Sequence, residues 1–215
     1  MTSPIDNSAL ILVDIQMDFC PGGALAVQSG DEVVAVANRL AARFPLVVAT
    51  QDWHPAHHRS FASQHPGRSV GDVIELDGLP QVLWPDHCVQ GTSGAAFNAD
   101  LDTRPVEAVF RKGTDPAIDS YSGFFDNARR KRTGLAGYLR DRGVKTLYVM
   151  GLATDYCVRA TALDGVELGF AVRLIPEGCR AVDLAAGDGE RAIREMGEAG
   201  VGVVDPGALE RLASA

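Results

Sequence analysis

The 215-residue chain has only four cysteines and no CxxC pair among them. Because the cysteines are scattered, they indicate neither a disulfide framework nor a cysteine-type zinc site. No apolar run approaches the roughly 20 residues that a membrane-spanning helix needs. The N-terminus has no positively charged leader, and Asp6 interrupts its short apolar stretch, so no signal peptide is expected. We therefore expect a cytoplasmic protein without a membrane partner.

Positive charge is also scarce, since 20 Lys and Arg face 28 Asp and Glu for a net charge of −8. This balance argues against nucleic acid or an anionic membrane surface as the main partner. Hydrophobic residues make up 46% of the chain and charged residues 22%, which is typical of a globular protein. The length fits one domain spanning residues 1–215, and no internal repeat is visible.

Short apolar runs alternate with helical patterns along most of the chain. The runs span residues 9–13, 46–50, 106–110, 146–150, 170–175 and 201–204, and the helical patterns span 31–43, 134–142, 155–168 and 188–199. This alternation predicts an α/β fold in which helices cover both faces of a parallel sheet. Residues 53–104 break the pattern, with no clear buried strand and many Pro, His, Gly and Trp residues. We interpret this segment as a long active-site excursion, because structureless loops of that length are usually functional.

Potentially reactive residues follow four of the predicted strands in turn. They are Asp14, Asp52 with His54, Lys112 and Cys157. Since ligands bind beyond the carboxyl ends of the strands in an open parallel sheet, we expect these side chains to share one edge.

Cys157 lies where a strand turns into a helix, with Thr154 as the expected N-cap. A thiol in the first helical turn is favoured as thiolate, and the free amides there can bind an oxyanion. The alternative for this residue alone is an inert buried cysteine. The partners expected on the same edge favour a nucleophile.

Asp14 and Lys112 are the expected partners of the thiol. A carboxylate directly after a buried strand is partly desolvated, which raises its pKa and suits it to accept a thiol proton. A fixed ammonium would hold that carboxylate and support the thiolate. The alternatives are a helix cap or turn former for Asp14 and a solvated surface residue for Lys112.

Asp52 and His54 are two residues apart, so on an extended chain both can face one point. His87 could complete a mixed oxygen and nitrogen metal site, with His57, His58 and His65 as competing ligands. Such a set, with open positions for water, suits zinc, iron or manganese, and the sequence does not choose among them.

Five sequence blocks resemble the cysteine hydrolases of the isochorismatase-like superfamily, and among these the nicotinamidases. The blocks are LILVDIQMDFCPGGALAV, QDWHPAHHRSFAS, LWPDHCVQGT, VFRKGTDPAIDSYSGFFDN and MGLATDYCVRATALDG, and the likeness runs from about residue 9 to residue 204. The resemblance implies six parallel strands in the order 3-2-1-4-5-6 between two helical layers.

The resemblance also implies roles for individual residues. It implies that Asp14, Lys112 and Cys157 are the catalytic residues, and that the amides of Ala153 and Cys157 form the oxyanion hole after a cis peptide at Leu152–Ala153. It also implies that Asp52, His54 and His87 bind the metal. The walls of the pyridine pocket would be formed by Phe19, Trp84 and Tyr121. Ser60 falls where some relatives place a further metal ligand. One divalent transition metal is implied, with zinc ahead of iron and manganese.

The implied activity is hydrolysis of nicotinamide, and of pyrazinamide, through a Cys157 thioester in the recycling of nicotinamide into NAD. A relative acting on isochorismate would not need the three metal ligands, whereas one acting on N-carbamoyl amines would share the catalytic residues. A non-catalytic binding module on the same fold is a third alternative. A homo-oligomer is left open.

Overall fold

A computed structural model describes residues 5–205, 207–208 and 210–211. Six strands form one all-parallel sheet in the order β5-β2-β1-β6-β7-β8. They are β1 (Ser8–Val13), β2 (Val47–Asp52), β5 (Val106–Lys112), β6 (Thr146–Leu152), β7 (Ala171–Arg180) and β8 (Gly202–Val203). Counted within the sheet, this is the expected order 3-2-1-4-5-6.

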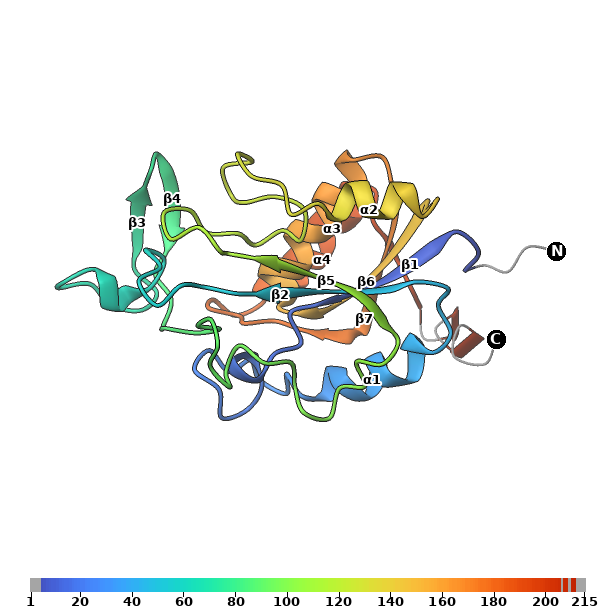
Figure 1. Cartoon of the computed structure of the whole chain (residues 1–215), viewed down its shortest axis with the longest axis horizontal. Helices are drawn as coiled ribbons and strands as arrows, with labels where there is room; N and C mark the ends of the chain where they lie inside the picture. The colour runs from blue at the N-terminus through green and yellow to red at the C-terminus, as the bar shows by residue number, and fades with distance from the viewer. Residues whose placement is uncertain (1–4, 206, 209, 212–215) are drawn as a thin grey trace.

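Helices cover both faces of this sheet, as expected (Figure 1). Helix α1 (Glu32–Ala41) lies on one face, and α2 (Leu135–Asp141), α3 (Arg159–Glu167) and α4 (Asp188–Glu198) lie on the other. Among the described residues, no helix is long and apolar enough to cross a membrane.

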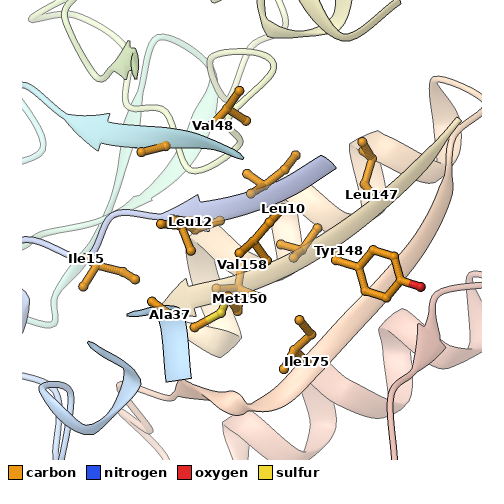
Figure 2. Close-up of a cluster of buried hydrophobic side chains, with 14 of the residues drawn as sticks. Leu10, Leu12, Ile15, Ala37, Val48, Leu147, Tyr148, Met150, Val158 and Ile175 are labelled. Carbon is orange, nitrogen blue, oxygen red and sulfur yellow. The ribbon is translucent and has the colours of Figure 1, made fainter. Parts of the chain in front are cut away.

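The central strands are buried on both sides, which explains their continuous apolar runs. Every residue of β1 and all but the first residue of β6 are buried. Figure 2 shows Leu10 and Leu12 of β1 beside Met150 of β6 in the core of the sheet. Strand β5 lies at the edge and alternates between partly buried and exposed positions, yet it ends on the buried Lys112. The sheet therefore gives the residues at its carboxyl edge a rigid base.

Two local features differ from the sequence-based expectations. The segment 53–104 contains a small hairpin of β3 (Val73–Leu76) and β4 (Leu79–Val82), which projects from the sheet (Figure 1). Its turn residues, Asp77 and Gly78, have φ of 52° and 83°, as a type I′ turn requires. Most of its positions are at least partly exposed, so the expectation of no buried strand there holds but overlooked the hairpin.

The expected N-cap at Thr154 is wrong. A π-helical turn spans Thr154–Val158 and runs into α3, and its N-cap is Ala153, which makes no side-chain capping bond. The amides of Tyr156 and Val158 both donate to the Ala153 carbonyl, at 3.1 Å each. The wider turn therefore starts one residue earlier than the sequence indicated.

Candidate active site and metal centre

Lys112 lies at the centre of a buried polar cluster. Its Nζ lies 2.9 Å from Asp14 Oδ2 and donates to Asp52 Oδ1 at 2.7 Å. It also donates to the Ser120 carbonyl at 2.9 Å and to Cys157 Sγ at 3.3 Å. Burial opposes the charge, but the two carboxylates outweigh it and raise the pKa of Lys112 well above its usual value. The ammonium therefore stays charged and holds the thiol and both carboxylates together.

The sheet register accounts for this meeting. Asp52 and Lys112 are partners at the ends of β2 and β5. On the other side of β1, Val13 pairs with Gly151 of β6, so Asp14 leaves its strand level with the start of the turn that holds Cys157. Because parallel strands end at one edge, four chemically active residues from distant parts of the sequence converge.

Asp14 is fully buried, and its backbone lies in the left-handed region with a φ of 48°. Thr50 Oγ1 donates to Asp14 Oδ1 at 2.7 Å. Burial raises the pKa of Asp14 despite the opposing charge of Lys112. A carboxylate in this state is a stronger base than one in water, as expected for a group that accepts a proton.

The expectation that the helix start favours the thiolate form of Cys157 is not met. Burial raises the pKa of the Cys157 thiol well above its usual value, even though Lys112 acts in the opposite direction. The Sγ atom and one oxygen each of Asp14 and Asp52 lie within 4.8 Å of one another. The thiol is therefore protonated at rest and has a carboxylate base close by.

The peptide bond between Leu152 and Ala153 is cis, as the family resemblance implied. Both Ala153 and Cys157 are buried and line the same pocket. The structure thus brings the two residues expected to form the oxyanion hole to one place beside the thiol.

Asp52, His54 and His87 also converge. One ligand atom from each lies within 4.8 Å of the other two, and all three side chains are buried. Asp52 Oδ2 lies 3.4 Å from His54 Nε2 and 3.8 Å from His87 Nε2. Gln16, which sequence reasoning missed, fixes Asp52: its Nε2 donates to the Asp52 carbonyl at 2.9 Å, and its Oε1 accepts from the Asp52 amide at 2.8 Å.

The chemistry of these donors fits a divalent transition metal. His54 Nδ1 bonds the Gly113 carbonyl at 2.9 Å and His87 Nδ1 bonds the Pro85 carbonyl at 2.8 Å, which leaves each Nε2 as the free nitrogen. His54 Nε2 is buried without a hydrogen-bond partner among the described residues. Burial lowers the pKa of His87 to about 4, so that ring is neutral, whereas the charge of Asp52 outweighs burial and raises the pKa of His54. Two imidazole nitrogens and a carboxylate suit zinc and its neighbours.

The other candidate histidines lie differently. His57 is exposed, and His65 Nε2 bonds the Arg59 carbonyl at 2.7 Å, so neither faces the three ligands. His58 is fully buried, and its Nδ1 bonds Ser60 Oγ at 2.7 Å. Ser60 therefore contacts His58, and no bond between Ser60 and the three ligands is found among the described residues.

A pocket opens between the thiol and the metal ligands. The expected Phe19, Trp84 and Tyr121 all line it, and Trp84 Nε1 donates to Tyr121 Oη at 3.2 Å. Four further lining residues were missed: Leu25, Asp119, Tyr156 and Val182. Tyr156 packs edge-on against Trp84, with ring centroids 4.9 Å apart, and it could have been suspected because it precedes Cys157.

The six-stranded parallel sheet between two helical layers, with a buried thiol, carboxylates and an ammonium at its carboxyl edge, defines the class as an α/β protein with one polar site at that edge. The family model for the isochorismatase domain matches residues 8–205, and the chain belongs to that family.

Individual proteins similar to this chain include several nicotinamidases and pyrazinamidases. A nicotinamidase of Escherichia coli is 54% identical over 196 residues, which cover 89% of this chain and 92% of that protein. A solved nicotinamidase and pyrazinamidase structure from Acinetobacter baumanii has a TM-score of 0.90 and 48% identity, covering 94% of this chain and 97% of its own. A pyrazinamidase of Pyrococcus horikoshii, solved in complex with zinc, has a TM-score of 0.76 and 40% identity. The match covers 93% of this chain and 99% of that chain.

Proposed function

We propose that this protein is a nicotinamidase, which hydrolyses nicotinamide to nicotinic acid and ammonia through a thioester on Cys157 and also accepts pyrazinamide. The observation that carries the proposal is the contact of one buried ammonium, that of Lys112, with Asp14, Asp52 and Cys157. Relatives named for this activity, at up to 54% identity, support the choice of substrate.

The first half of the reaction forms the thioester. Asp14 accepts the Cys157 proton, and the sulfur attacks the carboxamide carbon. The amides of Ala153 and Cys157 bind the oxyanion that develops. Asp14 then returns its proton to the leaving nitrogen, and ammonia departs. The raised pKa of Asp14 suits both directions of this transfer.

The second half repeats this sequence with water. Asp14 accepts a proton from water, whose oxygen attacks the thioester carbon; the C–S bond breaks, Asp14 returns the proton to the sulfur, and nicotinic acid leaves. Lys112 stays charged throughout and fixes the positions of Asp14 and the sulfur. One water molecule is consumed and one ammonia is released per turnover.

Substrate recognition is assigned to the pocket walls and the metal ligands. Phe19, Trp84 and Tyr121 would enclose a flat heteroaromatic ring. Asp52, His54 and His87 would hold one divalent ion, which we propose to be zinc because a similar protein was solved with it. Bound there, the ion supplies a Lewis acid that can receive a ring nitrogen and polarise water.

The wider setting is part of the same proposal. The chain would act as one domain, with residues 53–104 supplying one side of the active site, and would return nicotinamide to NAD synthesis in the cytoplasm. Its net charge of −8 fits a small-molecule substrate better than nucleic acid. A homo-oligomer is compatible with this role.

Ammonia release from nicotinamide by the purified protein tests the proposal. We expect Cys157→Ala to abolish release with fold and metal content intact, because the thiol forms the covalent bond. Cys179→Ala is the matched control, since Cys179 is equally buried and its thiol donates to the Ile175 carbonyl at 3.3 Å. Substantial turnover by the Cys157 variant would rule out the thioester.

An N-carbamoyl amine serves as the second substrate in the same assay, because that alternative shares the catalytic residues. Faster ammonia release from the N-carbamoyl amine than from nicotinamide would show that the protein is an N-carbamoyl amine hydrolase and not a nicotinamidase.

A further inference from the structure

Two buried polar groups beside His54 have no part in the proposed mechanism. His58 is fully buried, its Nε2 makes no hydrogen bond of ordinary geometry among the described residues, and the ring has only a weaker interaction with the Ile118 backbone there. Asp119 is 3% exposed and lines the pocket that also holds Cys157 and His87. One ligand atom each of His54, His58 and Asp119 lies within 4.8 Å of the other two.

The hydrogen bonds of His58 define its tautomer. The Ser60 amide donates to His58 Nδ1 at 3.2 Å, so this nitrogen accepts and carries no hydrogen. The Ser60 hydroxyl, 2.7 Å away, donates to the same nitrogen. In a neutral ring the hydrogen then resides on Nε2. The buried Nε2 is therefore a donor and has no lone pair to offer a metal.

Asp119, by contrast, is a hydrogen-bond acceptor. Its Oδ2 accepts from Gln81 Nε2 at 3.0 Å and its Oδ1 from the Ser120 amide at 2.8 Å. No Lys or Arg forms an ion pair with it among the described residues, although the carboxylate is buried. Each carboxylate oxygen can accept a second hydrogen bond, so Asp119 is under-supplied with donors.

These two groups do not form a second metal site with His54. One imidazole nitrogen binds one ion, and His54 Nε2 already faces Asp52 and His87. What remains next to His54 is one N–H donor and one carboxylate acceptor. Such a pair binds and orients a water molecule, and transition-metal sites with three protein ligands keep water in their open positions.

We propose that Asp119 and His58 are positioning residues that hold a water ligand of the metal. Asp119 accepts a hydrogen bond from this water, and His58 Nε2–H, kept in that tautomer by Ser60, donates to the oxygen of the same water. This inference rests on the proposed metal site. It also assigns Ser60, which the sequence suggested as a metal-shell residue, an action through His58 instead of direct ligation.

The test is the affinity of the metal-free protein for Zn²⁺, measured by competition with a chromogenic chelator. Loss of an outer partner of this kind weakens metal binding by about 10- to 100-fold. We expect that loss for Asp119→Asn. The matched control is Asp126→Asn, because Asp126 is also buried in the segment after β5. Its carboxylate accepts hydrogen bonds from the amides of Arg130 and Lys131 at 2.9 and 2.8 Å. The control should bind Zn²⁺ like the wild type.

Thermal unfolding of each protein without and with Zn²⁺ separates positioning from a purely structural role. If Asp119 acts through metal-bound water, Asp119→Asn changes mainly the stabilisation that Zn²⁺ adds. Unchanged Zn²⁺ affinity in Asp119→Asn, or an equal loss in Asp126→Asn, overturns the proposal.

X-ray absorption of the zinc-loaded protein tests whether His58 is a ligand of the ion. We expect two imidazole ligands in the wild type, and in His58→Gln one bound Zn²⁺ with the same two imidazoles but weaker affinity. Three imidazoles in the wild type would make His58 a ligand and refute the inference. Failure of the wild type to bind any Zn²⁺ would instead refute the metal site of the proposed function.

Discussion

The Lys112 ammonium separates two buried carboxylates that would otherwise repel each other. Removing one partner from a buried ionic cluster costs about 3–5 kcal/mol, because the remaining charges lose their compensation. We therefore expect Lys112→Met to lower the free energy of unfolding by about that amount and to abolish ammonia release. Urea denaturation monitored by circular dichroism measures the first effect.

Lys131→Met is the matched control for Lys112. Lys131 is exposed, and its Nζ donates to Thr114 Oγ1 at 3.2 Å. Surface substitutions of this kind change stability by within about 0.5 kcal/mol. Equal stability of the two variants would show that the buried ammonium does not hold the cluster together.

At the residue scale, the sequence predicted the residues at strand ends and missed those whose role depends on tertiary neighbours. Asp14, Asp52 and Lys112 could be located because each ends or comes directly after an apolar run. Asp119 was missed because it lies near His54 only in the folded chain, and His58 was expected only as a competing metal ligand. The thiolate expectation for Cys157 failed for a related reason, since complete burial outweighs the helix start.

At the element scale, the turn after β5 supports a metal ligand. Gly113 has a φ of 64°, and a Cβ added there would overlap the His54 ring, lying 2.6 Å from Nδ1. The Gly113 carbonyl also bonds that nitrogen. We expect Gly113→Ala to displace the ring and weaken Zn²⁺ binding at least about tenfold, as loss of an outer partner does. Chelator competition measures this change.

Gly67→Ala is the control for backbone strain. Gly67 has a φ of 80°, but nothing lies within 4 Å of an added Cβ. Both variants should lose about 1–2 kcal/mol of stability from the left-handed conformation, and only Gly113→Ala should lose Zn²⁺ affinity. A comparable loss of affinity in both would assign the effect to general destabilisation.

The elements themselves were largely readable from the sequence, because alternation of apolar runs and helical patterns is a strong local property. The hairpin of β3 and β4 was overlooked because its strands are short and mainly exposed, although Asp77–Gly78 is a typical hairpin turn. The π-helical turn at Thr154–Val158 could not be predicted, since apolar spacing does not distinguish it from an α-helical turn.

At the scale of the whole molecule, the metal ligands join β2 to the segment after the hairpin. Binding to the folded state alone stabilises it by about 2.7 kcal/mol at a ligand concentration 100 times Kd. For a domain of this size that corresponds to a rise in Tm of roughly 5–10 °C. We expect Zn²⁺ to raise the Tm of the metal-free wild type by that amount and to leave His87→Ala unchanged. An equal shift in both proteins would place the zinc elsewhere.

The pocket is also a property of the whole fold, because its walls come from the end of β2 and from segments after β1, β4, β5, β6 and β7. If Phe19, Trp84 and Tyr121 enclose the ring and the metal receives a ring nitrogen meta to the carboxamide, the ring nitrogen should decide substrate choice. Pyrazinamide keeps a nitrogen at that position and should be hydrolysed well.

Benzamide has the same amide and almost the same shape but no ring nitrogen. Loss of a polar contact in a closed site costs several kcal/mol, so kcat/KM should fall roughly a hundredfold or more relative to nicotinamide. If the aromatic residues were ordinary core and the metal only structural, benzamide would react about as well as nicotinamide. Ammonia release from the three amides, measured side by side on zinc-loaded protein, distinguishes the two cases. Comparable rates for benzamide would remove the metal from substrate recognition while leaving the roles of Asp14, Lys112 and Cys157 intact.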